Sequence, residues 1–205
     1  MMRTISWCSL GLLVLSGACA NGDGRGFASV DGTLRVTAPD DDFTTAAGDP
    51  ATLERFTVSV ANVSLVESTA GTSVVQTRTA ALPVGSSFDP LDGDFALPFG
   101  PYEVDRGEFD TLSVSIRRFE AAGDANGAAF TMIYAPSTPL VLSSPAALPV
   151  DGERAPNVHL QITVDLPKDL LEGIDPLSES AAEALAARLA AAPEVVKATW
   201  KRTGD

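Results

Sequence analysis

The sequence predicts a mainly β protein, an antiparallel β-sandwich that carries one amphipathic helix near its C-terminus. Three observations lead to this fold class. Apolar and polar residues alternate over many short stretches, turn-forming glycine and proline residues separate those stretches, and a late alanine- and leucine-rich segment has helical spacing. The chain has 205 residues, of which 45% are hydrophobic, and this suffices for one ordinary domain with a buried core.

Residues 157–167 give the clearest alternation, because their aliphatic side chains fall on one face of a strand and their polar side chains on the other. Residues 55–68 alternate in the same way, but the apolar phase shifts between Val60 and Val63. Such a shift predicts a β-bulge inside one long strand. Further strands are expected at 32–38, 72–79, 94–99, 110–119, 128–135 and 139–144.

The stretch FALPFGPYEV, residues 95–104, predicts a structural corner in preference to the wall of a binding site. Gly100 permits a sharp bend and Pro101 cannot donate to a strand ladder, so strand pairing should end there. Tyr102 would then open the next segment. Its ring should pack inward while its hydroxyl bonds to backbone, as in a tyrosine corner.

Residues 168–205 change character and predict a helical extension that packs on the sandwich. Asp175 followed by Pro176 is one suitable helix start. Ser180 with Glu183 is the alternative start, because the two residues have the spacing of a capping box. The predicted helix is amphipathic in either case, and proline after its last turn should end it.

The helix should bury a narrow stripe, since Leu185 and Leu189 lie one turn apart and small alanines flank them. Arg188 and Glu183 should face solvent. Residues 194–202 fit a strand by alternation and a helix by the spacing of their apolar residues, and we favour the strand.

Residues 1–18 have the pattern of a bacterial lipoprotein signal peptide. Arg3 precedes an apolar stretch that ends at Leu15, and small residues follow. Cys19 stands where a lipobox places the lipidated cysteine, whereas the alternative is ordinary cleavage after Ala20. The other cysteine of the chain also lies within the leader, so a cysteine kept at the cleavage point favours lipidation of Cys19.

Domain boundaries follow from this leader. We expect a flexible tether at 19–31, a β-sandwich domain at 32–167 and the C-terminal extension at 168–205. The predicted localisation is extracytoplasmic, with the protein held at a membrane by its N-terminal lipid. No aspartate follows Cys19 directly. If lipoproteins are sorted as in enterobacteria, this favours the outer membrane over a periplasmic or cell-surface location.

The formal net charge of -13 argues against a nucleic-acid partner, because an acidic surface repels phosphate backbones. The same charge disfavours binding to an anionic bilayer through charge alone. Phosphate-binding glycine motifs are absent from the sequence, and no cofactor is predicted.

Candidate catalytic residues are few. His159 is the single histidine and lies on the polar side of its strand, which is typical of a surface residue. Two acidic runs could bind calcium, which prefers oxygen ligands, but charge runs are more often solvated loops. These weak metal candidates are Asp40, Asp41, Asp42, Asp89, Asp92 and Asp94.

Four segments together resemble a family of bacterial extracytoplasmic lipoproteins, the domain of unknown function 4382. They are GTLRVTAPDDD, FTVSVANVSLV, LPFGPYEV and VHLQITVDL, which occur in that order over residues 32–166. The resemblance implies a transthyretin-like or immunoglobulin-like sandwich behind a lipoprotein leader. It implies no known activity.

The sequence therefore predicts a membrane-anchored lipoprotein without catalytic activity, whose sandwich binds a partner or has a structural role in the cell envelope. Its partners would be the membrane, through the lipid, and an envelope protein or a glycan. Two alternatives stay open: an exported hydrolase that uses carboxylates, and a calcium- or glycan-binding module.

Overall fold

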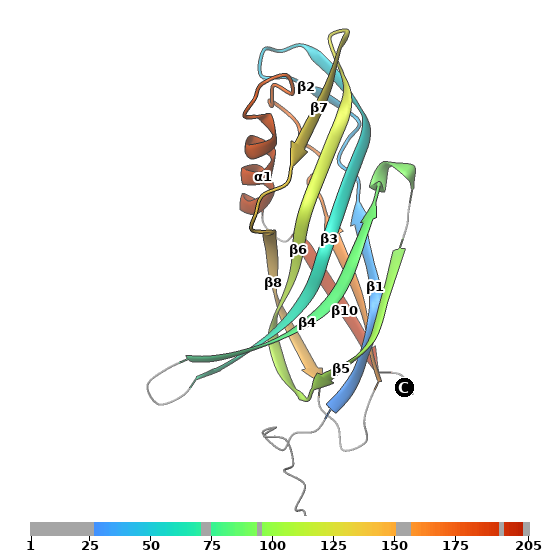
Figure 1. Ribbon diagram of the computed structural model, residues 1–205, viewed down its shortest axis with the longest axis vertical. Coiled ribbons are helices and arrows are strands. Elements are labelled where there is room, and N and C mark those ends of the chain that lie inside the picture. The colour runs from blue at the N-terminus through green and yellow to red at the C-terminus, as the bar shows by residue number, and fades with distance from the viewer. Residues whose placement is uncertain (1–26, 71–74, 94–95, 151–156, 193–194, 203–205) are drawn as a thin grey trace, which may run out of the picture.

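The computed structural model describes residues 27–70, 75–93, 96–150, 157–192 and 195–202. Two β-sheets face each other and form a sandwich, and one helix lies beside it (Figure 1). This confirms the predicted mainly β fold class with a helix near the C-terminus. Alternating burial along the strands explains the arrangement, because each sheet turns its apolar side chains toward the other.

The first sheet, sheet A, has four strands in the order β10-β9-β1-β5. The strands β1 and β9 pair in parallel, whereas the sequence predicted only antiparallel neighbours. Parallel pairing is possible because a long excursion of the chain through the other sheet separates the two strands. The strands of sheet A are β1 (Phe27–Thr37), β5 (Ala96–Asp105), β9 (Asn157–Asp165) and β10 (Val196–Arg202).

The second sheet, sheet B, is built on two long central strands, β3 and β6. The strands β2 and β4 pair with different ends of β3, and β7 and β8 pair with different ends of β6. The strands of sheet B are β2 (Asp42–Thr44), β3 (Pro50–Ala70), β4 (Val75–Phe88), β6 (Gly107–Ala125), β7 (Ala128–Tyr134) and β8 (Leu140–Val150). A short 3-10 helix, η1 (Pro90–Asp92), follows β4.

The phase shift predicted in β3 is confirmed as a bulge. The pairing register of β3 with both β4 and β6 slips between Val60 and Asn62. Val60 and Val63 are both buried, although two residues that follow strict alternation could not both face inward at that spacing. The bulge therefore lets one long strand keep its apolar side chains in the core on both sides of the slip.

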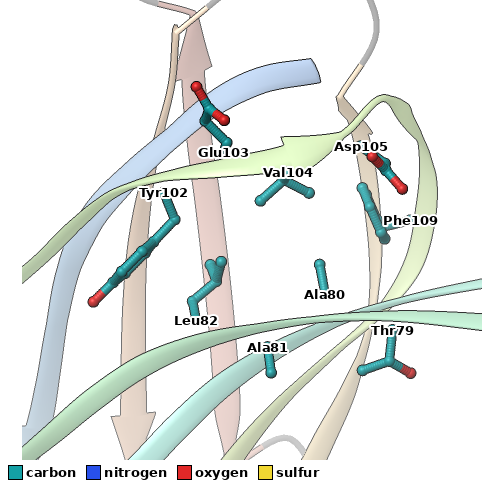
Figure 2. Close-up of a pocket in the computed structure, with 9 residues that line it drawn as sticks. All are labelled: Thr79, Ala80, Ala81, Leu82, Tyr102, Glu103, Val104, Asp105 and Phe109. Atoms are coloured by element: carbon teal, nitrogen blue, oxygen red, sulfur yellow. The ribbon is translucent and has the colours of Figure 1, made fainter. Parts of the chain in front are cut away.

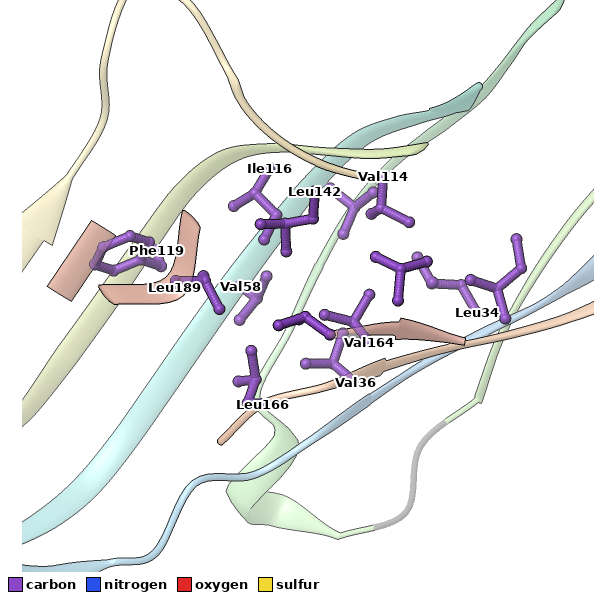
Figure 3. Close-up of a cluster of buried hydrophobic side chains, with 14 of the residues drawn as sticks. Leu34, Val36, Val58, Val114, Ile116, Phe119, Leu142, Val164, Leu166 and Leu189 are labelled. Atoms are coloured by element: carbon purple, nitrogen blue, oxygen red, sulfur yellow. The ribbon is translucent and has the colours of Figure 1, made fainter. Parts of the chain in front are cut away.

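The core lies between the two sheets and continues under the helix (Figure 3). Leu34 and Val164 come from sheet A, and Val58 and Ile116 come from sheet B. Each fully buried aliphatic or aromatic side chain of this size contributes about 1.5–3 kcal/mol to folding relative to an exposed one. No disulfide is needed to explain how such a core holds the two sheets together.

The helix α1 (Ala181–Ala191) packs against β7 and β8 through the predicted stripe of Leu185 and Leu189. The helix begins after Ser180, the second of the two predicted starts, but the capping box predicted there is wrong because the Ser180 side chain makes no capping hydrogen bond. Instead, the Ser180 hydroxyl lies 3.1 Å from the Ser178 hydroxyl in the turn that precedes the helix.

Arg188 corrects a second expectation for this helix. Its side chain was expected to be free in solvent, but its Nη1 donates to the backbone carbonyls of Asp169 and Leu170 at 3.2 and 3.1 Å, and also to that of Glu172. These carbonyls belong to successive turns between β9 and the helix. A single guanidinium therefore bonds to three backbone acceptors of this segment, although the Asp169 carbonyl also accepts from the amide of Glu172.

The predicted corner at Gly100-Pro101 is a bulge, and the expected end of strand pairing there is wrong. β5 pairs with β1 on both sides: Phe99 lies opposite Gly32, and Tyr102 lies opposite Val30. The Gly100-Pro101 bond is cis, and Gly100 has a φ of 85°. β5 is the last strand of sheet A in the described chain, so a residue on its outer edge need not donate a backbone hydrogen bond to another strand. Proline, which has no backbone N–H, is therefore tolerated here.

The strands also change how the two ends of the expected sandwich domain are described. β1 begins at Phe27, so residues 27–31 belong to sheet A and not to the tether expected at 19–31. The C-terminal extension is more than a helix, because residues 196–202 form β10 and pair with β9, as favoured from their alternation. The Nε1 of Trp200 on β10 donates to the carbonyl of Ala147 on β8 at 3.2 Å and so joins the two sheets on that side.

Candidate functional site

A groove opens on the other side of the sandwich, where the edge strand of sheet A faces the edge strand of sheet B (Figure 2). β4 contributes residues 79–82, β5 contributes residues 102–105, and β6 contributes Phe109. Its volume is about 340 Å³, which lies at the small end of the range for ligand pockets. A groove of this size accommodates a short segment of chain or a small molecule.

The floor of the groove is apolar because β4 and β5 both turn every second side chain inward. Leu82 and Val104 point toward each other across the groove, and Phe109 lies at its far end (Figure 2). All three side chains are buried in the core. The floor is therefore part of the buried core, which comes close to the surface where the two edge strands lie side by side.

Tyr102 closes the groove at the end where β4 and β5 come together. Its hydroxyl donates a hydrogen bond of 2.6 Å to the backbone carbonyl of Pro83 on β4. A hydroxyl bonded to backbone was expected for this residue, but the acceptor lies in the opposite sheet and not in a nearby turn. Tyr102 therefore joins the two sheets at this edge, as Trp200 does on the opposite side.

The rim of the groove is acidic. Glu103 and Asp105 alternate with the buried Val104 along β5, and Glu103 points away from the floor toward solvent (Figure 2). Among the described residues that line the groove, none carries a positive charge. The neighbouring Arg106 uses its Nε to donate to the carbonyl of Phe27, at the beginning of β1. A negative rim beside an apolar floor is thus the chemical character of this site.

Asp40, Asp41 and Asp42 lie in the loop before β2 and at its start, where they make separate local contacts. The Asp40 carboxylate lies 3.7 Å from the Lys168 ammonium, and the Asp42 carboxylate accepts from the Thr52 hydroxyl at 3.2 Å. At Asp41, the backbone carbonyl accepts from the amide of Leu53. These contacts attach the loop to β3 and to the segment after β9.

Asp89 has a structural environment that the sequence did not indicate. Its carboxylate accepts from the backbone amide of Leu91 at 2.9 Å, which caps η1, and from the amide of Phe56 on β3. Asp92 lies exposed in η1, and Asp94 lies outside the described residues. Over the part of the chain that the structure describes, no three histidine, cysteine, aspartate or glutamate residues gather as a metal site would require.

His159 has a partner that the sequence could not reveal. Its Nδ1 lies 2.6 Å from Oδ1 of Asp31, its neighbour on the parallel strand β1. Lys201 lies opposite His159 on β10, so one row of charged residues crosses sheet A. Both side chains of the pair are more than a third exposed on the outer face, away from the groove, where the pair supports the contact between β1 and β9.

Among the described residues, two carboxylates have a lowered pKa, and each accepts a hydrogen bond from a neighbouring strand. The hydrogen bond from the Lys197 ammonium is the main cause of the lowered pKa of Asp165, and the Thr37 hydroxyl adds to it. For Asp110, the hydrogen bond from the Thr111 hydroxyl is the main cause of the lowered pKa, and the amide of Ser68 also donates to it. A lowered pKa keeps each carboxyl group ionised, and an ionised carboxylate can accept the hydrogen bonds that join it to the neighbouring strand.

The described part of the chain thus defines a class of protein: a two-sheet β-sandwich with an acidic, apolar-floored groove between two edge strands. No family model, curated protein or solved structure matches the sequence or the fold. Cys19, the predicted lipidation site, lies outside the described residues. No helix in the described ranges combines the length and the apolar character of a membrane span.

Proposed function

We propose that this protein is an exported lipoprotein, anchored through a lipid on Cys19, whose β-sandwich serves the cell envelope as a binding module without catalytic activity. The leader pattern and the position of Cys19 at its end support the anchor. The groove between β4 and β5 supports the binding role, because it is a hollow of about 340 Å³ bordered by two strand edges. The outer membrane is the favoured location.

The position of the first strand carries the proposal. β1 begins at Phe27, and Phe27 pairs with Asp105, which lines the groove. Residues 20–26 separate Cys19 from Phe27, and seven residues span at most about 25 Å when fully extended. A lipid on Cys19 would therefore hold the groove close to the membrane surface, where a partner in the same membrane could reach it.

Metabolic labelling with a palmitate analogue tests the anchor in bacteria that express the full chain. We expect label on the wild-type protein and its recovery with the membrane fraction. Cys19→Ala should lose both the label and the membrane association. Cys8→Ala is the matched control, since it removes the other cysteine of the leader and should keep the label. Label that persists in Cys19→Ala, or a wild-type protein without label, would contradict the proposal.

A further inference from the structure

We propose that the end of the sandwich where β1 begins rests on the bilayer, with the Phe27 side chain inserted at the level of the lipid headgroups. The inference rests on the anchor at Cys19 proposed above, and it specifies which surface of the sandwich meets the membrane. Three features carry it: the exposure of Phe27, its short distance along the chain from Cys19, and the strand ends that surround it.

The fold leaves the aromatic ring of Phe27 in water. Phe27 is 61% exposed, the highest fraction among the large apolar residues of the described ranges. The alternation of β1 explains this exposure, because Ala28 and Val30 point into the core and Phe27 therefore lies on the outer face of the strand. A single exposed apolar side chain is ordinary on a protein surface, so the place of Phe27 in the chain decides its meaning.

The distance to the anchor selects a bilayer as the surface that covers Phe27. Residues 20–26 separate Phe27 from Cys19, and seven residues span at most about 25 Å even when fully extended. A lipid on Cys19 would therefore hold Phe27 at a high effective concentration beside the membrane. One aromatic ring would not recruit a protein from solution. It needs only a weak affinity for the bilayer when a lipid already keeps it there, because two signals together give stable binding.

Several strands begin or end at the level of Phe27, so this part of the molecule is one end of the sandwich. Asp105, the last residue of β5, lies opposite Phe27, and β6 begins at Gly107. β8 ends at Val150, opposite Gly107. β7 and α1 lie toward the other end of the molecule (Figure 1). With Phe27 at the headgroups, the long strands would lead away from the membrane.

The charges near Phe27 suit a headgroup layer without net charge. Arg106 donates from its Nε to the carbonyl of Phe27, and the acidic Asp105 pairs with Phe27 in the ladder. β10 ends at the same end of sheet A, where the Arg202 guanidinium lies 5.8 Å from the ring centroid of Trp200. Arginine and tryptophan both suit the boundary between membrane and water. Because cations and carboxylates are mixed here, the contact should need no anionic lipid.

This contact would also set the position of the groove. Asp105 lines the groove and lies opposite Phe27, so the groove would open directly above the headgroups. A partner embedded in the same membrane could then reach the groove, whereas β7 and α1 would face away from the bilayer.

The test uses tryptophan fluorescence of the lipidated protein in phosphatidylcholine vesicles, prepared with and without bromine on the acyl chains. Trp200 is the only tryptophan outside the predicted signal peptide, so Trp200→Phe gives a mature chain without tryptophan. Phe27→Trp in that background is the reporter. Bromine quenches only fluorophores close to it, and we expect brominated lipid to lower the reporter fluorescence at least twofold. An unquenched reporter would overturn the proposal.

Ile133→Trp in the same background is the matched control. Ile133 is also apolar and 50% exposed on a strand, but it pairs with Glu120, about 43 Å along β6 from Gly107. We expect brominated lipid to leave the fluorescence of this variant unchanged. Equal quenching of the two variants would overturn the proposal, because the sandwich would then not stand on the end that carries Phe27. Melting temperatures show whether each variant is folded. If Trp200→Phe does not fold, both substitutions are compared in the chain that keeps Trp200, after subtraction of the wild-type signal.

Three further results separate this inference from its rivals. Quenching of Phe27→Trp that appears only after anionic lipid is added would overturn the apolar contact. Sedimentation that shows a dimer of the full chain in detergent, broken by Phe27→Ser, would assign Phe27 to a contact between two copies instead. An unquenched reporter that still carries the palmitate label would refute this inference and leave the anchor standing, whereas quenching without palmitate label would do the reverse.

Discussion

The hydroxyl of Tyr102 donates a 2.6 Å hydrogen bond to the backbone carbonyl of Pro83, and this bond joins the edge strands of two different sheets. It also forms one end of the groove between β4 and β5. The bond therefore has two consequences: it stabilises the sandwich on this side, and it fixes where the groove stops.

Replacing Tyr102 with phenylalanine should lower the free energy of unfolding by about 1 kcal/mol, the usual net contribution of one such hydrogen bond. Urea denaturation monitored by circular dichroism measures the change. Tyr134→Phe is the matched control, because the ring of Tyr134 stacks on Phe119 with a centroid distance of 5.0 Å and that stacking survives the change. Equal destabilisation by both variants would show that the Tyr102 hydroxyl has no special role.

Asp165 should make stability depend on pH at the acidic end. The Lys197 ammonium lowers the pKa of this carboxyl below its ordinary value of 3.8, so the folded state favours the charged form. The resulting stabilisation is fully present above the unfolded pKa and disappears as the pH falls through the lower folded pKa.

Asp165→Asn tests this sign. The wild type should be more stable than the variant at about pH 7, and the difference should shrink toward about pH 3. Lys197→Met provides a second measurement, since it removes the main cause of the shift. A difference between wild type and Asp165→Asn that grows on acidification would contradict the assignment.

Gly32→Ala should strongly destabilise the protein. A Cβ at this position would lie 2.4 Å from the carbonyl oxygen of Leu160 and 2.7 Å from Cζ of Phe99. Such overpacking typically costs about 1–3 kcal/mol or more, and thermal melting measures the loss.

The double variant Gly32→Ala with Phe99→Leu separates the two contacts. Removing the ring relieves the side-chain clash, but the carbonyl of Leu160 belongs to the β9 backbone and stays in place. We therefore expect at most partial recovery relative to Phe99→Leu alone. Complete recovery would show that the ring was the entire obstacle.

Asp89→Ala should destabilise the protein by about 1–2 kcal/mol, because it removes the cap of η1 and an acceptor for the amide of Phe56. Asp92→Ala changes an exposed residue of the same short helix and should have little effect.

Thermal melting with and without calcium tests whether the acidic runs around Asp40 and Asp92 bind this ion. Addition of about 1 mM calcium, or of EDTA, should leave the wild-type melting temperature unchanged, since a ligand of the native state would raise it. A melting temperature that rises with calcium and falls with EDTA would instead support the calcium-binding alternative.

The sequence by itself determined most of the strands, the fold class and the position of the β-bulge in β3. Alternation located nearly every strand because burial on one face requires a period of two. The slip between Val60 and Val63 located the bulge for the same reason, since both residues must reach the core. The apolar stripe of the helix followed from the spacing of Leu185 and Leu189, again because burial selects one face.

Only the tertiary structure decided which strands meet. His159 and Asp31 become neighbours because β1 and β9 pair in parallel, and a separation of 128 positions along the chain leaves no pattern that could reveal this. The groove is likewise invisible in the sequence, because Leu82 and Val104 read as ordinary core residues until β4 and β5 become the edges of two sheets. A local pattern in the sequence shows whether each residue is buried. A site also depends on which segments lie side by side, and the fold as a whole determines that pairing.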